Sequence, residues 1–276
     1  MKKQSLILAS VIIGLGLAPA YSQFGPRAQT GPQLGGSTAK LFGENTAYSA
    51  TLEMQSTDSS TGDTTTTPGK VAALEGKSRF EMDLTQMKGG NLPPQAAEQM
   101  KQMGMDKMVV ISRPDKKISY IVYPNLEAYA EMAMQNPDAA APATNFKLET
   151  TELGKETLDG HPCVKNKTVV TDDKGNKHES IVWNATDLKN FPIKIETTGQ
   201  FSKTTAQIED EKLVKTETTT EQGHKATMLF KDVKLAKPDA GLFDPPTGYK
   251  HYDNMQQMMQ QEMMKRMGGG MGMPPH

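Results

Sequence analysis

The feature that most constrains the fold is a series of alternating segments that runs from residue 146 to residue 235 almost without interruption. Apolar and polar residues alternate along each segment, which is the period of a strand with one buried and one solvated face. The strongest turn signals between them are residues 172–176 and Gln222-Gly223. Strands joined this closely must be antiparallel, because a parallel neighbour needs a crossover of a dozen or more residues. The expected strands cover residues 146–158, 163–171, 177–183, 191–199, 203–210, 211–221 and 224–235.

The first half of the chain continues the same pattern. Residues 46–55 and 70–84 each alternate, and the polar tract 56–69 between them reads as a long hairpin loop. Two further strands flank a proline turn at residues 113–116. Good helix formers predict short helices at 94–104 and 125–135, and a Pro/Ala/Asn linker follows at 135–145. The fold class we expect is mainly β: one curved antiparallel sheet of about ten strands with two short helices.

The start of the chain reads as a secretory signal. Lys2 and Lys3 precede an apolar run, and residues 18–20 form a small-residue cleavage site, so residues 1–20 are expected to be removed on export to the periplasm or the extracellular space. Residues 21–40 read as a flexible leader, residues 41–252 as the folded domain and residues 253–276 as a Met/Gln/Gly-rich tail.

Charge and cysteine content exclude several classes of protein. The net charge of −1 offers no basic surface for nucleic acid. No apolar run outside the signal approaches the roughly 18–20 residues of a membrane-spanning helix. Cys163 is the only cysteine, so no internal disulfide forms and burial alone must hold the domain together.

Three segments carry a resemblance to a known group of proteins. Residues 183–197 place a tryptophan at a strand end before a polar turn and a proline, and residues 230–250 run from a strand to Leu242-Phe243 and Pro-Pro-x-Gly-Tyr. Residues 150–167 add a strand with a Gly and Cys pattern. Together they resemble exported proteins of unknown function with a domain like the bacterial lipoprotein-carrier (LolA-like) superfamily. The resemblance implies an incomplete barrel in which short helices form a lid over an apolar concave face that accepts acyl chains.

The methionine content is the compositional hint at function. The chain has 19 methionines against 16 aromatic residues, and those of the domain gather around the expected helices. Methionine is an adaptable apolar filler, so these residues indicate either ordinary core packing or a pliable lining for a lipid or amphipathic ligand. The residues expected to line such a site are Met82, Leu84, Met100, Met103, Met108, Ile121, Met228 and Phe230.

Two alternatives to lipid binding remain open. Thioethers are soft ligands for Cu(I), and the tail offers Met258, Met259, Met263, Met264 and His276 as a candidate copper site. The second alternative is a module whose outer sheet face binds a partner protein of the cell envelope.

An enzyme is the least favoured class, because no histidine lies at a metal or nucleophile spacing from another suitable residue. His161 and Cys163 share a strand face, but Pro162 and Gly160 mark the start of a strand there, so Cys163 reads as a structural thiol. No catalytic residue and no cofactor are therefore expected.

Overall fold

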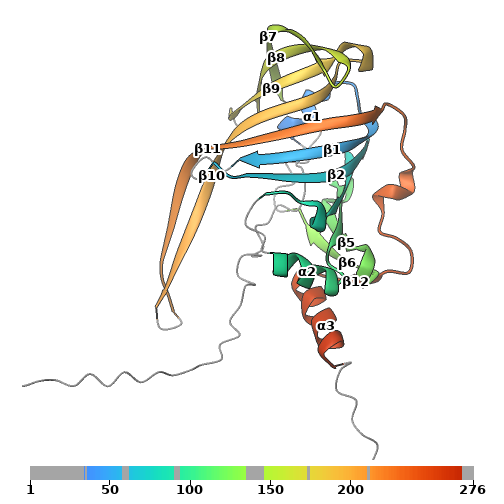
Figure 1. The fold of residues 1–276 in the computed structure, drawn as a ribbon, viewed down its shortest axis with the longest axis vertical. Helices are drawn as coiled ribbons and strands as arrows, with labels where there is room; N and C mark the ends of the chain where they lie inside the picture. The colour runs from blue at the N-terminus through green and yellow to red at the C-terminus, as the bar shows by residue number, and fades with distance from the viewer. Residues whose placement is uncertain are drawn as a thin grey trace, which may run out of the picture. The chain divides into compact units, whose positions relative to one another are not determined.

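The strands of the protein form one open, curved sheet (Figure 1). The computed structural model describes residues 34, 36–57, 62–89, 94–134, 146–172, 175–209 and 212–268. Within these residues the sheet has twelve strands. They are β1 (Ala47–Thr57), β2 (Thr64–Leu74), β3 (Lys77–Asp83), β4 (Lys107–Arg113), β5 (Ile118–Tyr123), β6 (Ala128–Ala133), β7 (Lys147–Leu158), β8 (His161–Thr171), β9 (Lys177–Ala185), β10 (Phe191–Glu209), β11 (Lys212–Lys234) and β12 (Lys250–Tyr252).

Three α-helices and several single turns of 3-10 helix accompany the sheet. The α-helices are α1 (Ser37–Leu41), α2 (Pro94–Gln102) and α3 (Met255–Gly268). The 3-10 turns are η2 (Leu84–Gln86), η3 (Pro114–Lys116), η4 (Pro124–Leu126), η7 (Thr186–Leu188) and η8 (Ala240–Phe243).

The strand order is β12-β6-β5-β4-β3-β2-β1-β11-β10-β9-β8-β7. Each strand pairs antiparallel with its neighbours, except that β12 pairs parallel to β6. Strand β11 returns to pair with β1, and this pairing joins the two halves of the chain. The sheet does not close on itself, so β12 and β7 are its two edges.

One face of the sheet carries the larger apolar cluster, and we call it the inner face. Strand registers align Ala50, Val71, Phe80, Val110 and Ile121 across five strands, and the row continues through Ala130 to Tyr252. Helices α1 and α3 contribute Leu41 and Met258 to the same cluster. This alternation is the one that the sequence of β1 predicts.

The opposite face, which we call the outer face, holds a smaller cluster around Leu74, Ile111, Tyr120 and Val122. Residues 235–249, which we call the strap, cover this cluster and insert Phe243 into it with no exposed surface. The strap then leads into β12 at the sheet edge and into α3, which contributes to the inner face. Residues 235–268 thus contact both faces of the sheet.

The expected fold class is confirmed in its main part, a single curved sheet, and the helix at α2 is also confirmed. The second expected helix, at 125–135, is wrong because these residues form the turn η4 and strand β6. Ala128 and Ala130 are fully buried between β5 and β12, with Tyr129 between them less buried. Tertiary pairing overrides the helix propensity of Ala, Glu and Met here.

Two expectations about the first strands of the chain are corrected. Thr64–Gly69 belong to β2 rather than to a loop, since they pair with the second half of β1. The expected strand 70–84 is divided by a two-residue turn at Glu75-Gly76, both with positive φ. A turn of this kind matches the twist of the strands that it joins.

The expected hairpin at Gln222-Gly223 is wrong, because β11 continues through these residues. Gly199 pairs with His224 and Gln200 pairs with Gln222, so Gly223 is the extra residue of a β-bulge. A glycine inside a strand often marks a bulge. Four expected strands therefore merge into β10 and β11. The total is nevertheless twelve rather than about ten, because the expected strand 70–84 divides into parts of β2 and β3 and because β6 and β12 were not expected as strands. The hairpin at 172–176 is confirmed.

Other expectations lie largely outside the described residues. The signal 1–20, the linker 135–145 and residues 269–276 belong to this group. Of the expected leader 21–40, residues 34 and 36–40 are described, and residues 37–40 belong to α1.

Candidate binding face

Two cross-strand pairs of methionines lie on the inner face. Met54 of β1 is the register partner of Met228 of β11, and Met82 of β3 is the register partner of Met108 of β4. Directly opposed residues of an antiparallel pair have Cβ atoms about 4.5–5.5 Å apart, so each pair lies within packing distance. Met82 and Met108 are buried, whereas Met54 and Met228 are half-buried. The pair Met82 and Met108 is therefore enclosed in the core, whereas the pair Met54 and Met228 is accessible from solvent.

The helices add further methionines to the same cluster. Met103 and Met105 follow α2 and pack with the core, Met103 half-buried and Met105 buried. Helix α3 contributes Met258, which has no exposed surface, together with the half-buried Met255 and Met259. Methionine has three rotatable bonds and a polarisable sulfur, so a surface built from it can repack around different shapes.

A glycine lies between the two methionine pairs. Gly69 of β2 pairs with Leu52 on one side and with Met82 on the other. A Cβ at this position would lie 2.5 Å from Cε2 of Phe80 and 2.5 Å from the carbonyl oxygen of Glu81. The ring of Phe80 therefore lies directly against the backbone of β2, and only glycine leaves room for it.

The structure brings seven of the eight expected lining residues into one cluster. Met82, Met108, Ile121 and Phe230 are buried core residues, whereas Leu84, Met103 and Met228 are half-buried at its margin. Met100 is half-buried on α2 and is not part of the cluster. The three half-buried side chains are the ones accessible from solvent, because the four buried ones already pack against protein.

Helix α3 places the candidate copper residues that it carries in different environments. Met258 is fully buried, Met259 is half-buried and Met264 is 58% exposed. The side chain of Met263 and the whole of His276 lie outside the described residues. Met258 and Met264 therefore do not share one face of the helix. In the described part of the chain, no three His, Cys, Asp or Glu residues are grouped so as to hold a metal ion.

The side chains of His161 and Cys163 do not pair with each other, in agreement with the expectation that Cys163 is a structural thiol. The Sγ of Cys163 is buried and donates to the backbone carbonyl of His161 at 3.3 Å. The ring Nδ1 of His161 lies 2.8 Å from Oδ2 of Asp187 instead. Burial raises the pKa of the Cys163 thiol, which opposes formation of the reactive thiolate.

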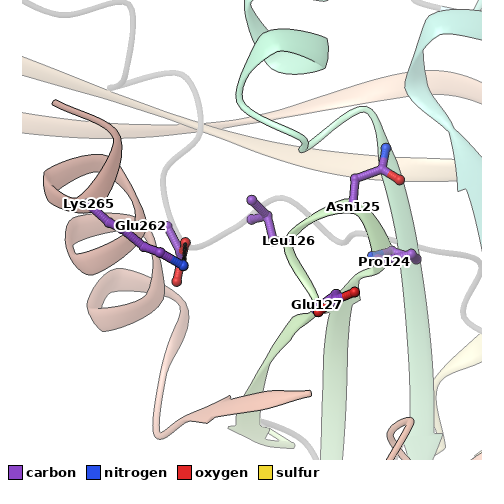
Figure 2. A pocket seen from close by; sticks show the side chains of 6 residues that line it. All are labelled: Pro124, Asn125, Leu126, Glu127, Glu262 and Lys265. Atoms are coloured by element: carbon purple, nitrogen blue, oxygen red, sulfur yellow. Dashed lines mark ion pairs between the residues drawn. The ribbon is translucent and has the colours of Figure 1, made fainter. Parts of the chain in front are cut away.

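A polar pocket with a volume of about 570 Å³ lies between the turn η4 and helix α3 (Figure 2). Pro124, Asn125, Leu126 and Glu127 line it from the turn, and Glu262 and Lys265 line it from the helix. The sequence did not reveal this site, since residues 125–135 read as helix and Glu262 lies in a Met/Gln tract. Two signals were present in Pro124 and Asn125, which are typical turn residues.

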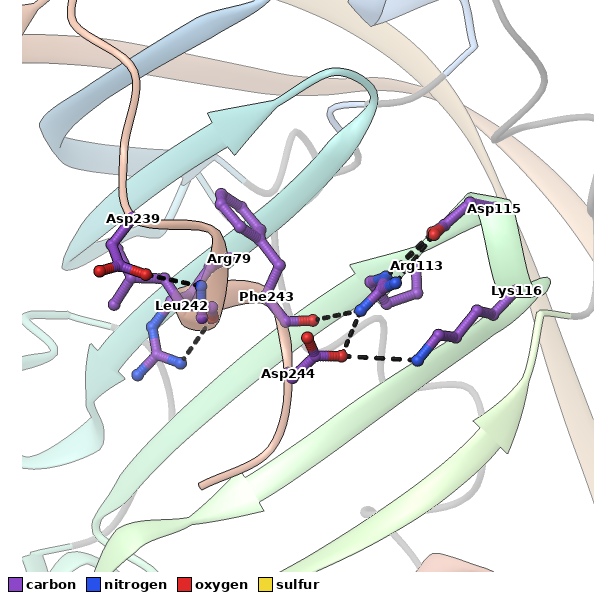
Figure 3. A network of polar contacts seen from close by, with 9 residues as sticks. Arg79, Arg113, Asp115, Lys116, Asp239, Leu242, Phe243 and Asp244 are labelled. Carbon is purple, nitrogen blue, oxygen red and sulfur yellow. Dashed lines mark hydrogen bonds and ion pairs between the residues drawn. The ribbon is translucent and has the colours of Figure 1, made fainter. Parts of the chain in front are cut away.

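Two arginines fix the strap to the outer face (Figure 3). Arg79 donates to the carbonyl of Leu242 at 3.1 Å, and Arg113 donates to the carbonyl of Phe243 at 3.1 Å. Arg113 also forms ion pairs with Asp115 and Asp244. These bonds hold Phe243 in the outer cluster, so the network is structural. The Arg113 guanidinium, through its hydrogen bond, lowers the pKa of Asp115.

No α-helix among the described residues is long and apolar enough to cross a membrane. In the same residues, every fully buried side-chain nitrogen or oxygen has a hydrogen-bond partner. The fold and its inner face define the class of protein: an open β-sheet domain with a methionine-bearing apolar face.

The chain belongs to the family described as domain of unknown function (DUF4412), which matches residues 71–249. The domain of unknown function expected from the sequence is thereby confirmed. A search of the curated proteins finds no match.

Several solved structures are similar to the chain. A LolA superfamily protein from Nitrosomonas europaea is 11% identical over 74% of this chain and 93% of that one, with a TM-score of 0.34. The lipoprotein LppX from Mycobacterium tuberculosis is 9% identical over 71% and 92%, with a TM-score of 0.35. LprF from Mycobacterium bovis is 10% identical over 74% and 92%, with a TM-score of 0.35.

Proposed function

We propose that this is a non-enzymatic exported protein whose inner sheet face binds a lipid or another amphipathic ligand. The observation that carries the proposal is the margin of the inner cluster, where Leu84, Met103 and Met228 are half-buried and continuous with the core. The pattern of residues 1–20 supports export.

The chemistry of this margin suits an acyl chain. Each CH₂ group transferred from water to an apolar surface contributes about 0.8 kcal/mol, so a chain of several groups needs no directional partner. Met54 and Met228 lie side by side in register, and unbranched thioethers adjust to a flexible chain. Rotation of the half-buried methionine side chains at this margin enlarges their contact area with an acyl chain, while the buried pair Met82 and Met108 stays packed.

Native mass spectrometry of gently purified protein tests the proposal. We expect adducts of lipid mass in repeated preparations, and we expect a fluorescent fatty-acid probe to bind the delipidated protein. A clean apo mass together with no binding of the probe would refute the proposal.

A matched pair of variants locates the binding. Met228→Lys places an ammonium at the half-buried margin, so we expect at least about a tenfold loss of probe affinity, equal to about 1.4 kcal/mol. Met264→Lys makes the same change at a side chain that is 58% exposed on α3 and lies outside the inner cluster. Equal affinities of the two variants would show that the probe binds elsewhere.

A further inference from the structure

The pocket between η4 and α3 combines charge of both signs with an apolar connection to the inner face. Its lining carries two carboxylates, Glu127 and Glu262, and one ammonium, Lys265. Its one aliphatic side chain besides proline is Leu126, which also packs against the inner cluster. Figure 2 shows Glu262 and Lys265 on the helix side and the turn residues across from them.

We propose that this pocket binds the zwitterionic headgroup of a phospholipid, one that carries an ammonium and a phosphate. This inference rests on the proposed function and adds the class of headgroup to it. The volume of about 570 Å³ lies within the range of about 300–1,000 Å³ that is usual for small-molecule sites.

The charges favour a zwitterion over a simple anion. With two carboxylates against one lysine, the lining is net negative and favours a cationic group. Behind the pocket, Asn125 donates to Oδ1 of the buried Asp106 at 2.8 Å, which adds another acidic residue on the same side. Among the lining residues, Lys265 is the one cation with which a fatty-acid carboxylate or an anionic headgroup could pair.

The two ends of the zwitterion find different partners. Glu262 is only 8% exposed and accepts a hydrogen bond of 2.6 Å from Tyr252, so its carboxylate is fixed in place. Glu127 is exposed on the turn and is the accessible acceptor for an ammonium. The Lys265 side chain is 77% exposed, and its Nζ lies 4.0 Å from Oε2 of Glu262. An ion pair with so exposed a lysine is weak, so the ammonium of Lys265 is available to a phosphate.

The position of Leu126 decides where the acyl chain goes. Leu126 lines the pocket and packs with the cluster to which Met255 and Met259 of α3 belong. A chain attached to a headgroup in the pocket therefore meets Leu126 first and then the methionines of the inner face. The polar pocket and the apolar margin together match the two halves of one amphipathic molecule.

The test compares four probes on the full chain by calorimetric titration below their micelle concentrations. The probes are lysophosphatidylethanolamine, lysophosphatidylglycerol, a fatty acid of the same chain length and glycerophosphoethanolamine without a chain. We expect the ethanolamine lysolipid to bind about tenfold more tightly than the glycerol lysolipid and the fatty acid, since it alone carries an ammonium that can pair with Glu127, whereas all three carry an anionic group that can pair with Lys265.

The variant Glu127→Gln with Lys265→Gln removes both accessible charges; the first change keeps the side-chain length and the second shortens the side chain by one atom. We expect it to lose the tenfold preference while its affinity for the fatty acid stays unchanged. The matched control is Glu75→Gln with Lys237→Gln, an exposed ion pair of 3.8 Å whose removal changes the same formal charges. Circular dichroism and thermal unfolding verify that both variants fold.

Each outcome decides the inference. A preference for the ethanolamine lysolipid that the pocket variant abolishes and the control retains supports it. Equal binding of all acylated probes overturns the inference and leaves the proposed function standing. A preference for the ethanolamine lysolipid that the pocket variant leaves unchanged has the same two consequences. Failure of every acylated probe to bind overturns both, and tight binding of the chainless glycerophosphoethanolamine alone overturns the link to the inner face.

Discussion

The hydroxyl of Tyr252 donates a hydrogen bond of 2.6 Å to Oε1 of Glu262, and both residues are buried. Tyr252 belongs to the edge strand β12 and Glu262 to helix α3, so this bond fixes the helix to the sheet edge. Two lysines also lie near this pair: Nζ of Lys265 is 4.0 Å from Oε2 of Glu262 at the surface, and Nζ of Lys250 lies 4.5 Å from the centroid of the Tyr252 ring. Buried charges need such partners.

Removal of the Tyr252 hydroxyl is expected to destabilise the protein. Tyr252→Phe leaves a buried carboxylate without its donor, and hydrogen bonds to charged groups contribute about 1.5–3 kcal/mol. We expect a loss of about 2 kcal/mol in the free energy of unfolding, measured by urea titration. Tyr249→Phe, at a half-buried tyrosine against the outer cluster, is the control and should change stability by less than about 0.5 kcal/mol. Equal effects of the two changes would contradict the role of the bond.

Substitution of Gly69 tests the packing between the methionine pairs. The Cβ of Gly69→Ala would lie 2.5 Å from Phe80 and from the Glu81 carbonyl, so side chain and backbone must both shift. Overpacking of this kind costs about 1–3 kcal/mol. A double-mutant cycle with Phe80→Leu should show that the penalty of Gly69→Ala is smaller when the ring is absent. Strict additivity of the two changes would show that the ring and the glycine are not in contact.

Loss of Arg113 is expected to release the strap. Its side chain is 9% exposed and bonds to Asp115, Asp244 and the carbonyl of Phe243. Arg113→Met keeps much of the side-chain volume but leaves these acceptors without their donor, so we expect a loss of about 2 kcal/mol. Hydrogen exchange should increase first in residues 240–244. Unchanged exchange in that segment would show that Phe243 alone holds the strap.

Lys116→Met is the matched control for Arg113→Met. Lys116 lies 3.5 Å from Asp244, and both side chains are about half exposed. An exposed pair of this kind contributes at most about 1 kcal/mol, so the control should leave exchange in the strap nearly unchanged.

How far the sequence predicts the fold depends on local pattern. The alternation of Tyr48, Ala50 and Leu52 is visible in the sequence, and all three residues are buried on the inner face as expected. The helix expected at 125–135 is wrong because Ala128 and Ala130 pack tightly inside the sheet. Helix propensity ranks alanine highly in either setting, so it does not distinguish a buried strand alanine from a helical one. The hairpin expected at Gly223 is wrong for a similar reason, since a glycine suits a bulge as well as a turn.

How far the sequence predicts the candidate site depends on long-range pairing. The gathering of Met82, Leu84, Met103 and Met108 follows from strands and a helix that are near in sequence. The pairing of Met54 with Met228 requires β11 to return beside β1, a contact across most of the chain that no local pattern reports. The same holds for the pocket, whose two sides, Glu127 and Glu262, meet only after the strap has crossed the outer face.

The stability of the strap should depend on pH through Asp115. Its hydrogen bond to Arg113 gives Asp115 a lowered pKa in the folded state. A group of this kind contributes stability above its unfolded pKa, near 3.8, and loses it as the pH falls through the lower folded value. The side chain is 45% exposed, so the contribution is below about 1 kcal/mol. Asp115→Asn should therefore lower stability at pH 7 and leave it nearly unchanged near pH 2; a loss that persists at pH 2 would contradict the linkage.

The thiol of Cys163 is expected to react slowly in the folded protein. It is 3% exposed and donates to the carbonyl of His161, and burial raises its pKa, so both access and thiolate fraction are low. Reaction with a disulfide reagent such as dithionitrobenzoate at pH 8 should be at least about a hundredfold slower than in 8 M urea, because it requires local opening of the sheet. Folded protein that reacts at the unfolded rate would show instead an accessible thiolate. Cys163→Ser should cost about 1–3 kcal/mol of stability, because a hydroxyl replaces the buried thiol in an apolar cluster.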